Sequence, residues 1–251
     1  MKSARYPPQR PDTSWTNAVQ HLLPALVLAL SIAVAGSSIG AGLEHFRLGD
    51  RNILIKGLAE QTVESDFVTW PLTVRRAGNS FDAVYQALTT DRDKIIAFLR
   101  GLGFTDDELE VRPLAVTDKY SREYAQRDTP TRYAGSALVV VKSDRVEAVA
   151  KAAMGTDPLI ASGVQLEFGG GPQYELRAFN DVKGPLLAAA TANALEQAQA
   201  FAANAGAELG KLKSANQGVI QISGTAGNPY DAASSKTKRL RVVSTFSYYL
   251  K

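Results

Sequence analysis

The longest uncharged stretch of the chain is long enough to span a lipid bilayer. No Asp, Glu, Lys or Arg occurs from Thr13 to Leu43, and the strongly apolar part runs from Leu22 to Leu43. As a helix, these 22 residues would extend about 33 Å, close to the roughly 30 Å hydrocarbon core of a bilayer. We therefore expect one transmembrane helix over residues 22–43, preceded by a short segment, residues 1–21, and followed by a large domain, residues 44–251.

The flanking charges predict the orientation of this helix. Three basic residues and one acidic residue precede it, and Glu44 follows it. The positive-inside rule then places residues 1–21 in the cytoplasm and residues 44–251 outside it. In a bacterium, the chain would be a single-pass inner-membrane protein with a periplasmic domain. The alternative is a signal peptide cleaved after Ala35, although the uncharged run continues beyond that site to Leu43.

Two glycines in the expected membrane helix form a GxxxG pattern, Gly36 and Gly40. Glycines one turn apart leave one helix face without side chains, so a second helix can approach closely. The pattern therefore predicts packing between membrane helices. The alternative interpretation is that small residues are simply common near the ends of signal and anchor segments.

Residues 44–251 carry the patterns of an α+β domain. Apolar side chains alternate at Val68, Trp70, Leu72 and Val74, which predicts a half-buried strand over 63–76, and Pro71 places that strand at a sheet edge or a bulge. Further strands are expected at 51–56, 109–119, 132–142, 164–177, 214–223 and 239–249, and helices at 80–100, 145–154 and 180–206. This order predicts a mostly antiparallel sheet with helices packed on one face.

The longest expected helix is nearly uncharged. Between Leu186 and Ala207 it contains eleven alanines and one charged residue, Glu196. A helix with a solvated face normally carries charges along that face. We therefore expect this helix to contact a neighbouring subunit as well as its own sheet, with the candidate interface at Ala190, Ala194, Ala198 and Ala202. The alternative is that alanine serves only as a good helix former and that Asn and Gln supply enough polarity.

Composition argues against most catalytic chemistry. The chain has no cysteine, and its two histidines, His21 and His45, flank the expected membrane helix. Thiolate and imidazole chemistry, including zinc binding, is therefore not expected. Residues 44–251 carry 25 basic and 24 acidic side chains, a balance that is not typical of nucleic-acid binding. We expect no enzymatic activity, no metal, no cofactor and no nucleic-acid partner.

Three other motifs have both a functional and a structural interpretation. The acidic residues Asp106, Asp107, Glu108 and Glu110 are expected in a solvated loop, because consecutive carboxylates splay apart and calcium-loop spacing is absent. Gly169–Gly171 lacks the Lys-Ser or Lys-Thr pair of a phosphate loop and is expected at a hairpin turn. Lys238, Arg239 and Arg241 could contact an anionic partner or lipid head groups, or could protect a solvated strand edge.

Several short motifs together resemble the SIMPL-domain family. They are Ile55–Glu60, Asp66–Leu72, Ala205–Leu212, Ala215–Ile222 and Arg241–Leu250. The resemblance covers about residues 51–251, and the family includes periplasmic proteins of Gram-negative bacteria described as immunogenic or as linked to oxidative-stress defence. It implies an α+β domain outside the cytoplasmic membrane and ring-like or cage-like homo-oligomers, but no established reaction and no catalytic residues. The low charge of the long helix departs from the pattern expected of relatives.

These observations predict a non-enzymatic, membrane-anchored periplasmic protein that self-assembles into a ring or cage, with a scaffolding or envelope-stress role. Its partners would be copies of itself, the bilayer and another envelope protein. The alternative function is binding or detoxification of a small molecule in a pocket between sheet and helices. The aromatic residues considered for that pocket are Trp70, Tyr85, Tyr120, Tyr124 and Tyr133.

Overall fold

The computed structural model describes residues 26–40, 51–121, 129–167, 169–225 and 229–251. They form an α+β fold with antiparallel sheets, as predicted. The chain divides into two compact units. One comprises Met1–Leu54, Ala198–Ser214 and Ser247–Lys251, and the other comprises Ile55–Gln197 and Ala215–Phe246.

Residues 26–40 form a helix in which every side chain is exposed. Gly36 and Gly40 lie on this helix, and no heavy atom stands within 4 Å of the place a Cβ would take at either position. In the described part of the chain, no helix has both the length and the apolarity needed to cross a bilayer. Residues 22–25 and 41–43 of the expected membrane helix lie outside the described residues, as do residues 1–21, His21 and His45.

Five strands form the first sheet, in which β2 and β5 are the long central pair. The strands are β2 (Phe67–Gly78), β3 (Leu109–Val111), β4 (Ala115–Asp118), β5 (Tyr133–Ser143) and β6 (Gln173–Glu175). Their order is β3-β5-β2-β6, with β4 also paired to β5, and every one of these pairings is antiparallel. The alternation predicted for β2 is confirmed, because Val68, Trp70, Leu72 and Val74 are all buried.

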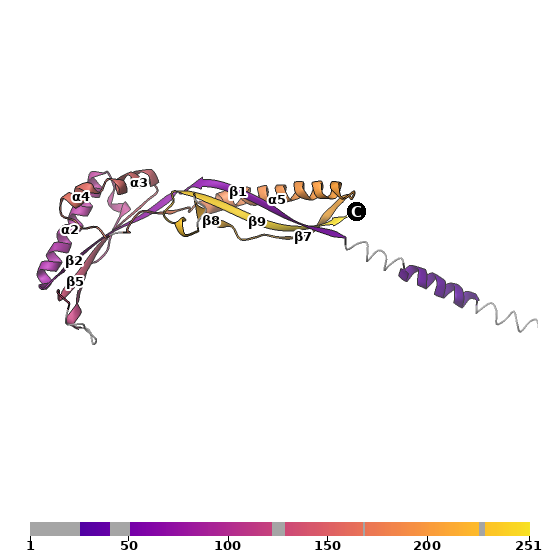
Figure 1. The fold of residues 1–251 in the computed structure, drawn as a ribbon, viewed down its shortest axis with the longest axis horizontal. Coiled ribbons are helices and arrows are strands. Elements are labelled where there is room, and N and C mark those ends of the chain that lie inside the picture. Colours follow the sequence, from indigo (N-terminus) through magenta and orange to yellow (C-terminus); the bar gives the residue numbers. More distant parts are fainter. Residues whose placement is uncertain (1–25, 41–50, 122–128, 168, 226–228) are drawn as a thin grey trace, which may run out of the picture. The chain divides into compact units, whose positions relative to one another are not determined.

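Three helices cover one face of this sheet (Figure 1). They are α2 (Phe81–Gly101), α3 (Val146–Met154) and α4 (Asp157–Ala161). Ser80 caps α2 as predicted, since its side chain accepts a hydrogen bond from the Ala83 N–H at 3.4 Å. Apolar side chains of α2, such as Leu88 and Ile95, are fully buried in the core beneath the helices. The helices therefore bury the apolar face of the sheet.

The second sheet contains four strands and is covered on one face by α5 (Phe179–Asn204) (Figure 1). The strands are β1 (Asn52–Glu64), β7 (Leu209–Asn216), β8 (Gln221–Gly224) and β9 (Thr237–Leu250). Their order is β1-β9-β7, and β8 also pairs with β9. Ala59, Leu186, Ala190, Leu240 and Val242 form the small core between helix and sheet.

Two elements of the predicted fold are corrected by these sheets. The domain has two sheets where one was expected, and helices cover one face of each. The first strand does not stop at Lys56 but continues to Glu64. The strand passes through Gly57, where a Cβ would stand only 2.0 Å from the Ala190 carbonyl oxygen. Glycine is therefore needed at this position, because α5 approaches the strand closely there.

Candidate functional site

The four alanines predicted to form a subunit interface are buried within the chain itself. Ala190, Ala194 and Ala198 are fully buried, and Ala202 is 2% exposed. The physical reason is close packing, because small residues spaced four apart form a smooth helix face that can lie directly on a strand. A contact between subunits through α5 must therefore use other residues of the helix.

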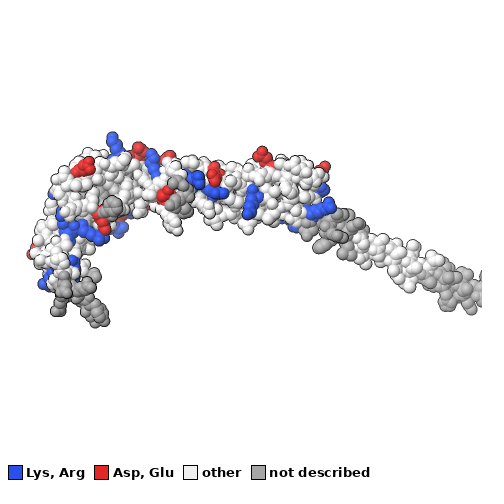
Figure 2. Space-filling view, in the orientation of Figure 1, with Lys and Arg blue, Asp and Glu red and all other residues white. Residues whose placement is uncertain are grey.

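The opposite side of α5 is exposed and almost uncharged. We define it as the outer face of α5, made by Ala188, Ala192, Leu195 and Glu196, all of which are exposed. Glu196 is the only charged residue from Gly184 to Asn204. Leu195 is 40% exposed, and Figure 2 shows a largely uncharged surface over α5. An apolar helix face of this kind is typical of a protein–protein contact.

The predicted basic cluster on β9 is divided between the two faces of the sheet. Lys238 is 3% exposed, and its ammonium group donates a hydrogen bond to the Ala232 carbonyl oxygen. Burial lowers the pKa of Lys238 from its usual range. Because side chains alternate along a strand, Arg239 and Arg241 project from the opposite face. Lys238 is therefore removed from the candidate anionic contact, and the two arginines remain.

The predicted acidic cluster is distributed among several cations. Asp106 pairs with Arg100, and Glu110 pairs with Arg112 and Lys142. Glu108 accepts hydrogen bonds from Arg145 and Ser143, and the bond from Arg145 is the main cause that lowers the pKa of Glu108 to about 2. These carboxylates diverge and hold neighbouring elements together. Among the described residues, no group of three or more His, Cys, Asp or Glu side chains has the arrangement of a metal site.

A cavity of about 440 Å³ lies beside β2. We call it the β2 cavity. Most of its walls are apolar, with polar groups from Thr73, Thr156 and Glu167. The remaining lining residues are Trp70, Pro71, Leu72, Ala153, Ile160, Leu166, Gly169, Gly170, Gly171 and Pro172. A mostly apolar cavity with a few polar groups is typical of small-molecule sites.

The glycine-rich wall of this cavity is a bulge and not the predicted hairpin turn. Leu166 bridges to Val74, and Gln173 pairs with Thr69, both antiparallel to β2. Leu166 and Gln173 are seven positions apart, but their partners, Val74 and Thr69, are only five positions apart. The chain therefore continues in one direction along β2 and accommodates two extra residues between Leu166 and Gln173, in the segment that contains the three glycines.

Pro71 explains why the bulge stands at this point of the sheet. It lies in β2 opposite the bulge and has no N–H to donate to a neighbouring strand. A Cβ on Gly170 would stand 2.9 Å from the Pro71 carbonyl oxygen, and Gly169 has a φ of 94°. Glycine is therefore required at both positions, one for close approach and one for its backbone conformation. The prediction that the strand of Pro71 lies at a sheet edge or is itself bulged is wrong, because β2 lies between β5 and β6 and its register with β5 is unbroken at Pro71. The irregular backbone lies instead in the segment that faces Pro71 on the other side of β2.

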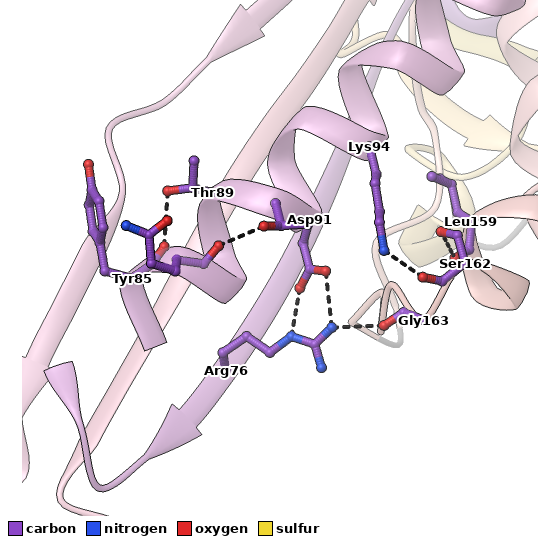
Figure 3. Close-up of polar contacts among 10 residues, drawn as sticks. Arg76, Tyr85, Thr89, Asp91, Lys94, Leu159, Ser162 and Gly163 are labelled. Atoms are coloured by element: carbon purple, nitrogen blue, oxygen red, sulfur yellow. Dashed lines mark hydrogen bonds and ion pairs between the residues drawn. The ribbon is translucent and has the colours of Figure 1, made fainter. Parts of the chain in front are cut away.

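Charged side chains hold α4, which contributes to the wall of the β2 cavity (Figure 3). Arg76 donates to both carboxylate oxygens of Asp91, at 2.6 and 3.0 Å, and to the Gly163 carbonyl oxygen at 2.8 Å. Lys94 donates to the Ser162 carbonyl oxygen at 2.6 Å. Ser162 and Gly163 directly follow α4, where free helix carbonyls attract cations. The buried Asp91, only 2% exposed, thus orients Arg76 toward the end of α4.

Of the four described aromatic residues that were predicted to line a pocket, Trp70 alone lines the β2 cavity. Tyr85 and Tyr133 both lie against Phe81, with ring centroids 6.2 and 6.0 Å from it, and Arg132 lies over Tyr120 and Tyr133. Tyr124 lies outside the described residues. The sequence analysis did not identify Thr156, Ile160 and Glu167 as lining residues of a cavity. Pro71 and the three glycines were the sequence signal for the irregular backbone beside it.

Comparison with known proteins supports the resemblance stated above. The model of a family described as "SIMPL: Protein of unknown function (DUF541)" matches residues 53–244, which is most of the chain. A comparison with curated proteins gave no match.

Proposed function

The chain belongs to the SIMPL family, and on this premise we propose that it is a non-enzymatic, membrane-anchored periplasmic protein that assembles with copies of itself into a ring or cage. Its role would be to organise or protect the cell envelope. Copies of the chain and the bilayer are the partners that this proposal requires.

The outer face of α5 is the observation that carries the proposal. A solitary helix in water would gain solubility from charged residues, yet this face offers one carboxylate over several turns. Ala188 and Ala192 are small, so an element from another copy could approach the helix backbone closely. Leu195 would then fill the space beside them and would become buried on assembly.

The membrane anchor is supported by the sequence and by the exposed helix at residues 26–40. Its large apolar side chains are between 58% and 67% exposed, as at Val34 and Leu26. Such a surface is unfavourable in water and suits a hydrocarbon environment. Anchored copies would be held at high effective concentration, so a modest interface on α5 would be sufficient for assembly. Gly36 and Gly40 would provide a second contact between anchors.

Replacing Leu195 with glutamate should prevent assembly without unfolding the chain. An unpaired carboxylate buried in an apolar interface costs several kcal/mol, so we expect association to weaken by about 100-fold. Light scattering of the full chain in mild detergent at micromolar concentration would give the mass of each particle. Met154→Glu is the matched control, because Met154 is 81% exposed on α3. A monomeric wild-type chain, or a Leu195→Glu variant that assembles normally, would contradict the proposal.

The β2 cavity favours a second function, which is binding of a small, mostly apolar molecule. Gly171 lines the cavity, and no heavy atom lies within 4 Å of a Cβ built there. A larger residue at this position therefore fits without a backbone clash and would take up space that a ligand needs. We expect Gly171→Leu to abolish the rise in melting temperature that a cavity ligand produces, while Gly101→Leu, an exposed position at the end of α2, retains it. A thermal-shift screen of the full chain with fatty acids, aromatic acids and aromatic amines would measure this effect. If none of these classes shifts the wild-type protein, this second function is wrong.

A further inference from the structure

The second sheet has a face that α5 does not cover. The helix packs on the face that carries Ala59, Leu240 and Val242. Because side chains alternate along a strand, the residues between these point to the opposite side of the sheet. We call that side the open face of the second sheet, made by the even-numbered residues of 56–64 on β1 and the odd-numbered residues of 237–245 on β9. All of them are exposed or half-buried, and all belong to one of the two compact units.

Two contacts show how β1 and β9 are aligned on the open face. Arg241 pairs with Glu60 at 3.3 Å, and the Thr237 hydroxyl donates a hydrogen bond to the Glu64 carboxylate at 2.8 Å. The two contacts are four positions apart on each strand and occur in opposite order along them. The strands are therefore antiparallel, and each step of two along β1 is matched by a step of two along β9.

The charges of the open face form two parallel rows of opposite sign. Glu60 and Glu64 project from β1 and form an acidic row, and Arg239 and Arg241 project from β9 and form a basic row. The two rows balance each other, and Lys56 lies beyond them along β1. A partner with charges of one sign would face a row of like charge, so this arrangement suits a partner that also presents one acidic and one basic row.

Beside the ion pair, the open face is apolar. The register places Leu58 next to Val243, and these side chains are 41% and 36% exposed. A hollow of about 460 Å³ adjoins Val243 and is lined by Val219, Gln221, Arg241 and Val243. The solvated face of an antiparallel sheet is normally polar. Exposed leucine and valine beside a hollow therefore indicate that another surface covers this part of the sheet.

We propose that the open face of the second sheet binds the same face of a second copy, so that two sheets pack against each other. A contact of this kind requires a surface that is complementary to itself. A two-fold axis that runs along the strands, between β1 and β9, places the acidic row of each copy over the basic row of the other. Glu60 then faces Arg241 of the second copy, while Leu58 faces Val243 of the second copy and the hollow beside it. The contact uses no residue of α5 and is independent of the assembly proposed above.

Reversal of single charges tests this contact directly. Glu60→Arg places arginine over Arg241 of an identical copy, and Arg241→Glu places glutamate over Glu60. Each variant alone should therefore dimerise at least about tenfold more weakly than its parent, because like charges that face each other across an interface are unfavourable. An equal mixture of the two variants pairs basic with acidic rows and should restore the dimer. The double variant Glu60→Arg/Arg241→Glu should also dimerise, since it exchanges the charges within one chain.

The measurement is native mass spectrometry of the full chain in a neutral detergent at micromolar concentration. Every sample would also carry Leu195→Glu, which removes the contact through α5, so that dimers are expected in place of rings or cages. Failure of the α5 contact would be observed in the chain without Leu195→Glu, and failure of the sheet contact in the chain with it. The two charge variants differ in mass, so a mixed dimer can be distinguished from either homodimer.

The matched control reverses an exposed ion pair outside the open face. Arg100 and Asp106 pair at 2.8 Å, with side chains 58% and 73% exposed. Arg100→Asp, Asp106→Arg and their mixture should all dimerise as the parent does. The proposal is overturned if the parent chain with Leu195→Glu is monomeric, if Glu60→Arg or Arg241→Glu dimerises as well as the parent, or if the mixture of these two variants remains monomeric.

Discussion

Substitution of Gly57 by valine should lower the free energy of unfolding by about 3 kcal/mol or more, the upper range for an overpacked core. A Cβ at this position would stand 2.0 Å from the Ala190 carbonyl oxygen and 2.7 Å from the Ala194 Cβ. The first of these atoms belongs to the backbone of α5, so it cannot rotate away as a side chain could. The helix would have to move away from β1, and the apolar contacts of the small core would be lost with it.

Urea unfolding of the full chain, followed by circular dichroism, would measure this loss. Gly101→Val is the matched control, because Gly101 is exposed at the end of α2 and no heavy atom lies within 4 Å of a Cβ built there. We expect the control to change stability by less than about 0.5 kcal/mol, the usual range for surface substitutions. Equal unfolding midpoints for the two variants would show that α5 does not approach β1 as closely as described.

Replacing Arg76 with methionine should destabilise the protein by about 3 kcal/mol, because it leaves the buried carboxylate of Asp91 without its partner. Asp91 is only 2% exposed, so water cannot solvate its carboxylate in place of the lost guanidinium group. The Arg76 side chain is 25% exposed and is partly solvated already. The variant also loses the hydrogen bond from Arg76 to the Gly163 carbonyl oxygen. Hydrogen exchange at α4 should therefore become faster than in the wild type.

A double-mutant cycle separates the ion pair from simple packing effects. The variant Arg76→Met/Asp91→Leu removes both charges, and we expect it to be more stable than Arg76→Met alone by at least about 1.5 kcal/mol. Denaturant unfolding of the wild type, both single variants and the double variant gives this coupling. Additive effects of the two substitutions would contradict the assigned role of Asp91.

Local sequence patterns were sufficient for the elements that depend on local physics. The period of two in β2 identified its buried face, and Ser80 identified the start of α2. The full length of β1 was missed because the strand passes through Gly57, and glycine is unfavourable in an ordinary strand. Only the position of α5, more than a hundred residues further along the chain, explains why glycine stands there.

The candidate interface on α5 shows a second limit of sequence reasoning. Alanines recur at a spacing of four both on the buried side, as at Ala190 and Ala194, and on the outer face, as at Ala188 and Ala192. Composition is nearly the same on both sides, so the pattern could not indicate which side faces the sheet. For Lys238 the signal was present, because it alternates in register with the buried Leu240 and Val242.

The pairing of β1 with β9 has a consequence for how the chain acquires its fold. Contacts between these strands join residues far apart in sequence, as from Glu64 to Thr237, which are 173 positions apart. A chain that is synthesised from its N-terminus therefore exposes β1 long before its partner strand has been made. Pairing between such distant segments is slow, because a large loop must close first. Until then β1 is an unpaired strand that can associate with other chains, so the interval before β9 is made is the one in which the chain is most prone to aggregate.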